Sequence, residues 1–172
     1  MGAAAGCHLN GCGSSHPEDR EVRFLTGVYE LFPAEILTRR PVVELDLGCG
    51  VGSFTAELAK RYPERTILAA DVMIGRLRKL VRRMHRMKLE NLTLLRSEAR
   101  FLLGLSLPDG ALDRIHLLCP DPWPKGRHRG HRLLASDFTA QLHRVLKPAG
   151  IFHFSSDDEA YCDAVRRVIA AS

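Results

Sequence analysis

The sequence has no long apolar stretch and few aromatic residues. Of its 172 residues, 45% are hydrophobic but only 6% are aromatic. No uncharged apolar run approaches the roughly 18 residues that a membrane span needs, so we expect a soluble protein without a membrane partner. The hydrophobic share is nevertheless too high for a disordered chain, and the length suits a single domain. The net charge of +5 favours an anionic partner without naming one.

Cysteine is scarce and scattered, which argues against a secreted disulfide scaffold. The five cysteines are Cys7, Cys12, Cys49, Cys119 and Cys162. Their odd number does not suit a disulfide framework. The N-terminal residues also lack the cationic and apolar regions of a secretory signal. We therefore expect a cytoplasmic protein.

The N-terminal segment holds Cys7, His8, Cys12 and His16, which could be read as four zinc ligands. Their spacing fits no common zinc module, and the stretch is rich in Gly, Ala and Ser. We therefore predict no metal, and a flexible N-terminus over residues 1–20.

Short apolar runs alternate with helical patterns from residue 42 onward. Strands are expected over residues 42–48, 66–71, 91–97, 112–119 and 151–156, and helices over 53–62, 74–88, 99–105, 133–146 and 158–170. The helical spacing of apolar residues also predicts a lead-in helix over residues 22–39. The alternation indicates an α/β domain over residues 21–172, with a doubly wound, mostly parallel Rossmann-like sheet covered by helices on both faces. Ligands of such folds bind at the carboxyl ends of the strands.

The first of these strands runs into a glycine loop whose three glycines are Gly48, Gly50 and Gly52. The spacing G-x-G-x-G differs from the dinucleotide fingerprint and disfavours a nicotinamide oxidoreductase. Acids follow at strand ends: Asp46 before the loop, Asp71 after the second strand and Glu98 after the third. Each acid alone could be a helix cap, but together with the loop they favour a nucleoside site. The charge of S-adenosylmethionine, with its ammonium and sulfonium, matches such an acidic site.

Two basic segments point to a polyanion. In the first, Asp121 stands between prolines, beside Trp123 and a run of cationic or titratable side chains: Lys125, Arg127, His128, Arg129, His131 and Arg132. The second segment runs from residue 76 to 88 and carries seven cations without an acid. Either could be a solvated surface, but together with the rigid, aromatic-containing loop they favour RNA binding.

These motifs, in this order, resemble the bacterial-type tRNA (guanine-N7-)-methyltransferase family, a class I S-adenosylmethionine-dependent methyltransferase. DLGCGVG, NLTLLRSEA, PDPWPKGRHRGHR and SSDDEAY carry the resemblance, which runs from about Val42 to about Ala171. It implies methylation of guanine N7 in the tRNA variable loop, with S-adenosylmethionine as cofactor and tRNA as partner.

The resemblance also implies roles for individual residues. Asp46, Asp71 and Glu98, with the three glycines, would hold the cofactor. Asp121 would be the active-site acid and would touch both cofactor and guanine. Lys125 and Asp157 would contact the substrate, and the residues Arg127, His128, Arg129, His131 and Arg132 would contact tRNA.

The sequence departs from the family near its end. Family members continue for several tens of residues, with an antiparallel strand pair and a Thr-x-x-Glu motif at the guanine pocket, which are missing before Ser172. The expected sheet would therefore have an open edge, covered by a homodimer partner or another protein. Two alternatives stay open: a tRNA-binding relative with impaired catalysis, and a methyltransferase of the same fold that acts on another substrate.

Overall fold

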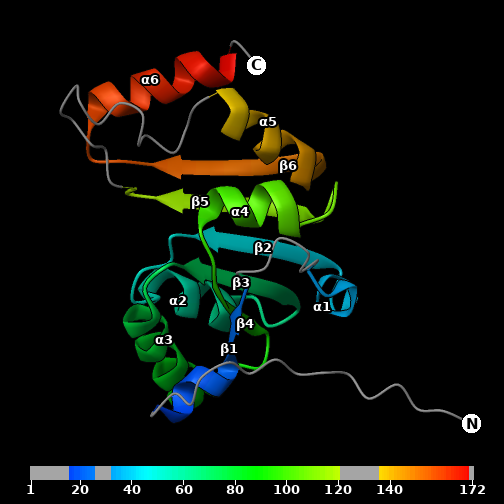
Figure 1. The fold of residues 1–172 in the computed structure, drawn as a ribbon, viewed down its shortest axis with the longest axis vertical. Helices are drawn as coiled ribbons and strands as arrows, with labels where there is room; N and C mark the ends of the chain where they lie inside the picture. Colours follow the sequence, from blue (N-terminus) through cyan, green and yellow to red (C-terminus); the bar gives the residue numbers. More distant parts are fainter. Residues whose placement is uncertain (1–15, 26–31, 121–135, 171–172) are drawn as a thin grey trace, which may run out of the picture.

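A single parallel sheet organises the described part of the chain, which comprises residues 16–25, 32–120 and 136–170 of the computed structural model (Figure 1). Within these residues the sheet has six strands in the order β1-β4-β3-β2-β5-β6. The strands are β1 (Val22–Phe24), β2 (Val42–Leu47), β3 (Arg65–Asp71), β4 (Leu92–Arg96), β5 (Leu112–Leu118) and β6 (Leu146–Ser155). Every pairing among them is parallel.

The helices that connect the strands cover both faces of the sheet. They are η1 (Pro17–Glu21), α1 (Ala34–Thr38), α2 (Ser53–Arg61), α3 (Ile74–Met87), α4 (Ala99–Phe101), η2 (Leu102–Ser106), α5 (Ser136–Val145) and α6 (Glu159–Ala170). In the described ranges, no helix is long and apolar enough to cross a membrane. The doubly wound, parallel Rossmann-like architecture predicted from the sequence is confirmed.

Two hydrophobic cores lie on opposite faces of the sheet because side chains alternate along each strand. On β2, Val43, Leu45 and Leu47 face the first core, which apolar residues of α1, η2, α5 and α6 complete. The second core joins α2 and α3 to the other face of β3 and β4. On that second face β2 carries Glu44 and Asp46, both buried. Charged groups thus sit in the centre of the sheet, where they need partners.

The predicted lead-in helix over residues 22–39 is wrong. Residues 22–24 form β1, which pairs with β4, and among the described residues of this range only α1 is helical. Val22 is buried in the second core and Leu25 in the first. Residues at odd separations in a strand point to opposite faces, whereas the helical prediction had placed both on one face.

The expected last strand also begins earlier than predicted, at Leu146 rather than Ile151. The register shifts between Leu112 and Arg114 of the neighbouring strand, and Ala149 has a positive φ of 64°. A β-bulge with a proline is tolerated here because β6 is the edge strand of the described sheet. The covering of this edge by a partner stays a prediction.

The flexible N-terminus expected over residues 1–20 needs a correction at its end. Asp19 accepts two hydrogen bonds from Arg78, at 2.7 and 2.8 Å, and Glu18 accepts one from Arg82 at 2.8 Å. These ion pairs fix η1 against α3 and neutralise part of its positive charge. Residues 1–15 lie outside the described residues.

Candidate functional site

The glycine loop follows β2 at the carboxyl edge of the sheet. Gly48, Gly50 and Gly52 have φ values of 79°, 58° and 72°, in the left-handed region that favours glycine. Gly52 has a second reason to be glycine, because a Cβ there would lie 2.4 Å from Leu80 Cδ1. A Cβ on Gly48 or Gly50 would meet no atom within 4 Å. The loop therefore has an open side on which a ligand can approach the backbone closely.

Asp71 ties this loop to the end of β3. Its Oδ2 accepts a hydrogen bond from the Gly50 N–H at 3.0 Å, and its Oδ1 accepts one from the Met73 N–H at 2.8 Å. Arg76 lies 3.5 Å from the same carboxylate. An ionised carboxylate has about four lone-pair sites, so Asp71 retains capacity to accept further hydrogen bonds.

Asp46 is a buried acid with a neutral partner. Its side chain is 3% exposed and accepts a hydrogen bond from the Thr55 hydroxyl of α2. Burial raises the pKa of Asp46; the Thr55 hydrogen bond and the nearby His116 act in the opposite direction, and the charge of Asp71 adds to the rise. Among the described residues, no cationic side chain forms an ion pair with Asp46. The site therefore holds a carboxylate that a cationic ligand would stabilise.

The cysteine inside the loop is not a nucleophile in this setting. Burial and the charges of Asp46 and Asp71 raise the pKa of the Cys49 thiol well above its ordinary range. A thiol in that state is protonated and unreactive at neutral pH. The chemistry of the loop thus rests on its backbone and on the two carboxylates.

Glu98 follows the end of β4 and Asp157 the end of β6, two strands that β3, β2 and β5 separate in the sheet. Glu98 is exposed and caps α4, accepting a hydrogen bond from the Phe101 N–H at 2.9 Å. The Ser97 N–H donates to the Asp71 carbonyl at 3.3 Å, which connects the end of β4 to that of β3. Asp157 is exposed just beyond β6. The structure therefore brings Asp46, Asp71 and the glycine loop together, with Glu98 one strand away and engaged as a helix cap.

The remaining predicted residues lie outside the described residues: Asp121, Lys125, Arg127, His128, Arg129, His131 and Arg132. β5, which precedes them in the chain, ends at the same edge of the sheet as the glycine loop. Cys119, with a φ of 47°, donates its N–H to the Ser155 carbonyl at 2.7 Å, so β5 and β6 end side by side.

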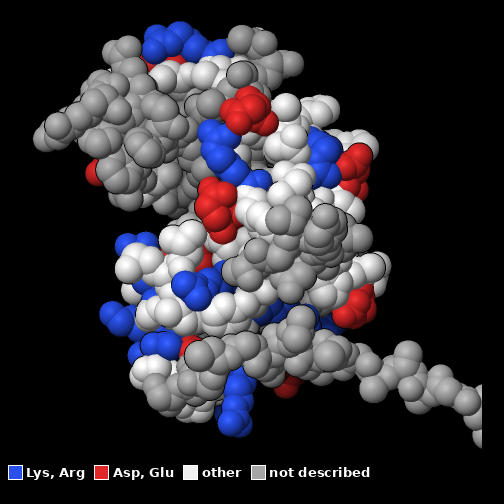
Figure 2. Space-filling view, viewed as in Figure 1, with Lys and Arg blue, Asp and Glu red and all other residues white. Residues whose placement is uncertain are grey.

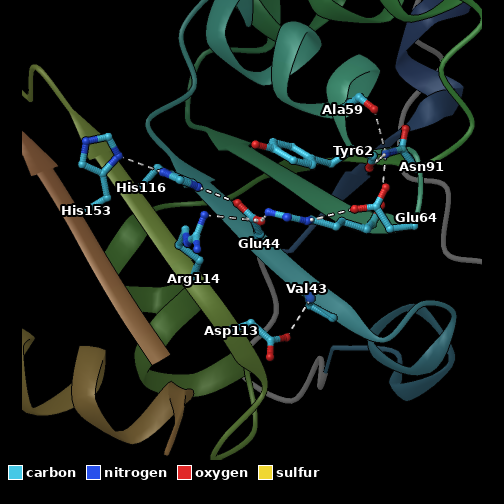
Figure 3. Close-up of polar contacts among 11 residues, drawn as sticks. Val43, Glu44, Ala59, Tyr62, Glu64, Asn91, Asp113, Arg114, His116 and His153 are labelled. Atoms are coloured by element: carbon cyan, nitrogen blue, oxygen red, sulfur yellow. Dashed lines mark hydrogen bonds and ion pairs between the residues drawn. The ribbon is translucent and has the colours of Figure 1, made fainter. Parts of the chain in front are cut away.

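Sequence reasoning missed a polar chain that crosses three strands (Figure 3). Glu44 of β2 accepts a hydrogen bond from Arg65 and pairs at 2.8 Å with His116 Nε2 of β5. The Nδ1 of His116 lies 3.1 Å from His153 Nδ1 of β6. Although burial acts to raise it, the pKa of Glu44 is lowered, because His116, Arg65 and Arg114 outweigh desolvation. The only sequence signal was an acid in the middle of an apolar strand.

Comparison with known proteins settles the family. A family model described as "Putative methyltransferase" matches residues 40–172. The chain belongs to this family. Its relatives include the tRNA (guanine-N(7)-)-methyltransferase of Syntrophotalea carbinolica. The two sequences are 40% identical over 134 residues, which cover 78% of this chain and 57% of the relative. The enzyme of the same name from Neisseria meningitidis serogroup A is 39% identical over 150 residues, 83% of this chain and 61% of its own.

The chain thus spans about three-fifths of the length of the curated methyltransferases it matches. Their name is that of the family whose motifs the sequence resembles, so the resemblance is confirmed. Solved structures agree on the methyltransferase fold. The 16S rRNA methyltransferase KamB has a TM-score of 0.61 at 20% identity, covering 83% of this chain and 74% of its own. The 16S rRNA (adenine(1408)-N(1))-methyltransferase of Catenulisporales acidiphilia was solved with its cosubstrate S-adenosylmethionine. It has a TM-score of 0.55 at 21% identity, and the match covers 70% of this chain and 58% of that one.

Proposed function

We propose that this chain binds S-adenosylmethionine and transfers its methyl group to N7 of a guanine in the variable loop of tRNA. The observation that carries the proposal is the convergence of two buried carboxylates, Asp46 and Asp71, on a glycine loop at the carboxyl edge of a methyltransferase sheet. The curated relatives named tRNA (guanine-N(7)-)-methyltransferase support the choice of substrate. The free cysteines among the described residues suit a reducing cytoplasm.

The residues present fit the cofactor on three counts. Gly48 and Gly50 leave space where any side chain would project. Asp71 can accept hydrogen bonds from ribose hydroxyls while it holds the loop. Asp46 offers a buried carboxylate with no ion-pair partner among the residues that the structure describes, which suits an ammonium group. When bound there, S-adenosylmethionine supplies a methyl group already activated by its sulfonium.

The protein's own task in this reaction is mainly to position the reactants. Guanine N7 carries a free lone pair, so no residue has to remove a proton before attack. Holding reactants in line contributes several kcal/mol in well-oriented reactions, on the order of 7 to 11 at the upper end. We assign Asp121 as the acid that favours the positive charge developing on the purine. Lys125 and Asp157 would contact the substrate base, and Glu98 the adenine side of the cofactor.

The tRNA backbone has a matching surface on α3, which lies at one side of the molecule where Lys and Arg side chains gather (Figure 2). Arg78 and Arg82 are paired with acids of η1, but Lys79 and Arg86 are exposed, with no ion pair to a described acid. These cations face solvent and can neutralise phosphates. The basic side chains over residues 127–132, which lie outside the described residues, are assigned a further contact with tRNA.

A single experiment tests the reaction directly. The protein is incubated with S-adenosylmethionine carrying a labelled methyl group and with unmodified tRNA, and the tRNA is then treated with borohydride and aniline. Strand scission in the variable loop identifies N7-methylguanine at the expected place. Label in tRNA without scission would replace this proposal with another methylated position, and cofactor binding without label would favour a tRNA-binding relative.

A further inference from the structure

Two histidines face each other across neighbouring strands at an unusually short distance. His116 of β5 and His153 of β6 are direct partners in the register, so their side chains leave the same face of the sheet. Their Nδ1 atoms are 3.1 Å apart, and the rings cross at 85° with centroids 5.3 Å apart (Figure 3). Two bare lone pairs, or two N–H groups, would repel at this distance. The geometry therefore requires either one hydrogen atom, donated by one ring and accepted by the other, or one metal ion between the two nitrogens.

Glu44 determines which nitrogen of His116 carries a proton. His116 Nε2 lies 2.8 Å from Glu44 Oε2, and an ionised carboxylate can only accept, so we assign the N–H to Nε2. Glu44 is itself fully buried and held by Arg65 on its other oxygen. With its N–H on Nε2, the His116 ring can present the lone pair of Nδ1 toward His153. A carboxylate on the far nitrogen is how proteins orient and strengthen metal-binding histidines.

We propose that His116 and His153 bind a divalent transition-metal ion of the Zn²⁺, Ni²⁺ or Cu²⁺ class through their Nδ1 atoms, with water in the remaining positions. Imidazole nitrogens suit these ions. With metal–nitrogen distances of about 2.0–2.1 Å, two tetrahedral ligands lie about 3.3–3.4 Å apart, so the pair has to open by only a few tenths of an ångström. His153 is exposed on the edge strand and can make that adjustment.

The surroundings leave room for the water ligands. The histidines line a hollow of about 350 Å³ together with Arg114, Ile151, Phe152 and Phe154. Ile151 is 49% exposed, so the hollow opens to solvent. No group of three or more potential protein ligands gathers anywhere in the described residues. The site is therefore a two-histidine site of moderate affinity rather than a closed structural one.

Arg114 is the feature of the hollow that opposes a cation. Its Nη1 lies 3.9 Å from Glu44 Oε1, and its charge would suit an anion instead. An anion seated between the two facing nitrogens, however, would need an N–H on each of them, which the 3.1 Å distance disfavours. Phosphate binding is thus the outcome that would contradict the metal assignment.

The test uses the full chain without an affinity tag, with Cys7 and Cys12 changed to serine so that the N-terminal thiols do not compete for metal. Zn²⁺ affinity is measured by competition with a chromophoric chelator after treatment with EDTA. We expect one bound ion per chain, and at least a tenfold loss of affinity for His153→Ala. Glu44→Gln should weaken binding by about 10- to 100-fold. His143→Ala, which removes an exposed histidine of α5, is the matched control and should bind as the parent does.

Two outcomes would contradict the proposed metal site. Unchanged Zn²⁺ affinity in His153→Ala overturns the site, as does a protein that inorganic phosphate protects against thermal unfolding while Zn²⁺ does not. His153 is exposed, so its alanine variant decides the question even if Glu44→Gln fails to fold. Neither tRNA nor S-adenosylmethionine takes part, so the result is independent of the proposed methyl transfer.

Discussion

The carboxylate of Asp71 accepts the Gly50 N–H across 3.0 Å, so the end of β3 holds the glycine loop that follows β2. Its second oxygen accepts the Met73 N–H at the start of α3. One side chain therefore fixes the two backbone segments between which the proposed cofactor would lie. The loop is prearranged by the protein itself, and a bound ligand does not have to order it.

Asp71→Asn tests this double role. The amide can replace only one of the two accepting oxygens, and its NH₂ group then faces a backbone N–H. Hydrogen bonds to charged groups contribute about 1.5–3 kcal/mol each, so we expect S-adenosylmethionine affinity to fall by at least tenfold and the melting temperature to drop. Isothermal titration and thermal denaturation measure the two effects. Glu57→Gln, at an exposed position on α2, is the charge-matched control and should change neither.

Gly52→Ala should destabilise the fold by about 1–3 kcal/mol, because the new methyl group meets Leu80 at 2.4 Å and φ is 72°. Urea denaturation measures the change. In a Leu80→Ala background the same substitution should cost less, since only the backbone term remains. Gly75→Ala in α3 is the control: its Cβ meets nothing, so we expect a gain of about 0.4–1 kcal/mol. Equal costs in both backgrounds would show that the contact with Leu80 is unimportant.

Asp46→Asn should make the protein more stable at neutral pH while it weakens cofactor binding. The pKa of Asp46 is raised in the folded chain, so its ionisation disfavours folding as pH rises above the ordinary value of 3.8. The neutral amide avoids this cost but offers no charge to an ammonium. Urea denaturation at several pH values should show the difference between variant and parent shrinking as pH falls through the raised folded pKa toward 3.8, and vanishing below 3.8. A variant that is less stable at neutral pH would contradict the assignment.

Glu44→Gln should behave in the opposite way, although the residue lies on the same strand. The pKa of Glu44 is lowered, so its stabilising effect is present above the ordinary value of 4.5 and is lost as pH falls through the folded value. Removing one partner of a buried charge pair costs about 3–5 kcal/mol. We expect a loss of this order at pH 7 in denaturant titrations, which should diminish in acid. A loss of stability that does not change with pH would indicate that Glu44 stabilises the fold through packing rather than through its charge.

The sequence was informative where a residue contrasted with its neighbours along the chain. Asp46 and Asp71 were found because they end apolar runs, and the glycine loop because tight turns need glycine. The chain Glu44–His116–His153 could not be found in this way, since it depends on β5 lying between β2 and β6. Glu98 was found at the right strand end, and its capping bond to Phe101 shows that the helix-cap alternative also holds. The order of the strands in the sheet and the capping of α4 arise only in the folded chain, so the spacing of residues along the sequence does not predict them.

The exposed cations of α3 lead to a prediction about tRNA binding, which rests on the proposed function. Changing Lys79 and Arg86 together to alanine should weaken tRNA binding and reduce the slope of log K against log salt by roughly two, about one for each phosphate that is no longer neutralised. Arg78→Ala is the contrast, because its guanidinium is engaged with Asp19 at 2.7 Å. That variant should lower the melting temperature by loosening η1 and leave the salt slope nearly unchanged. Filter binding at several salt concentrations measures the slopes, and equal slopes for the double variant and the parent would place the tRNA on another surface.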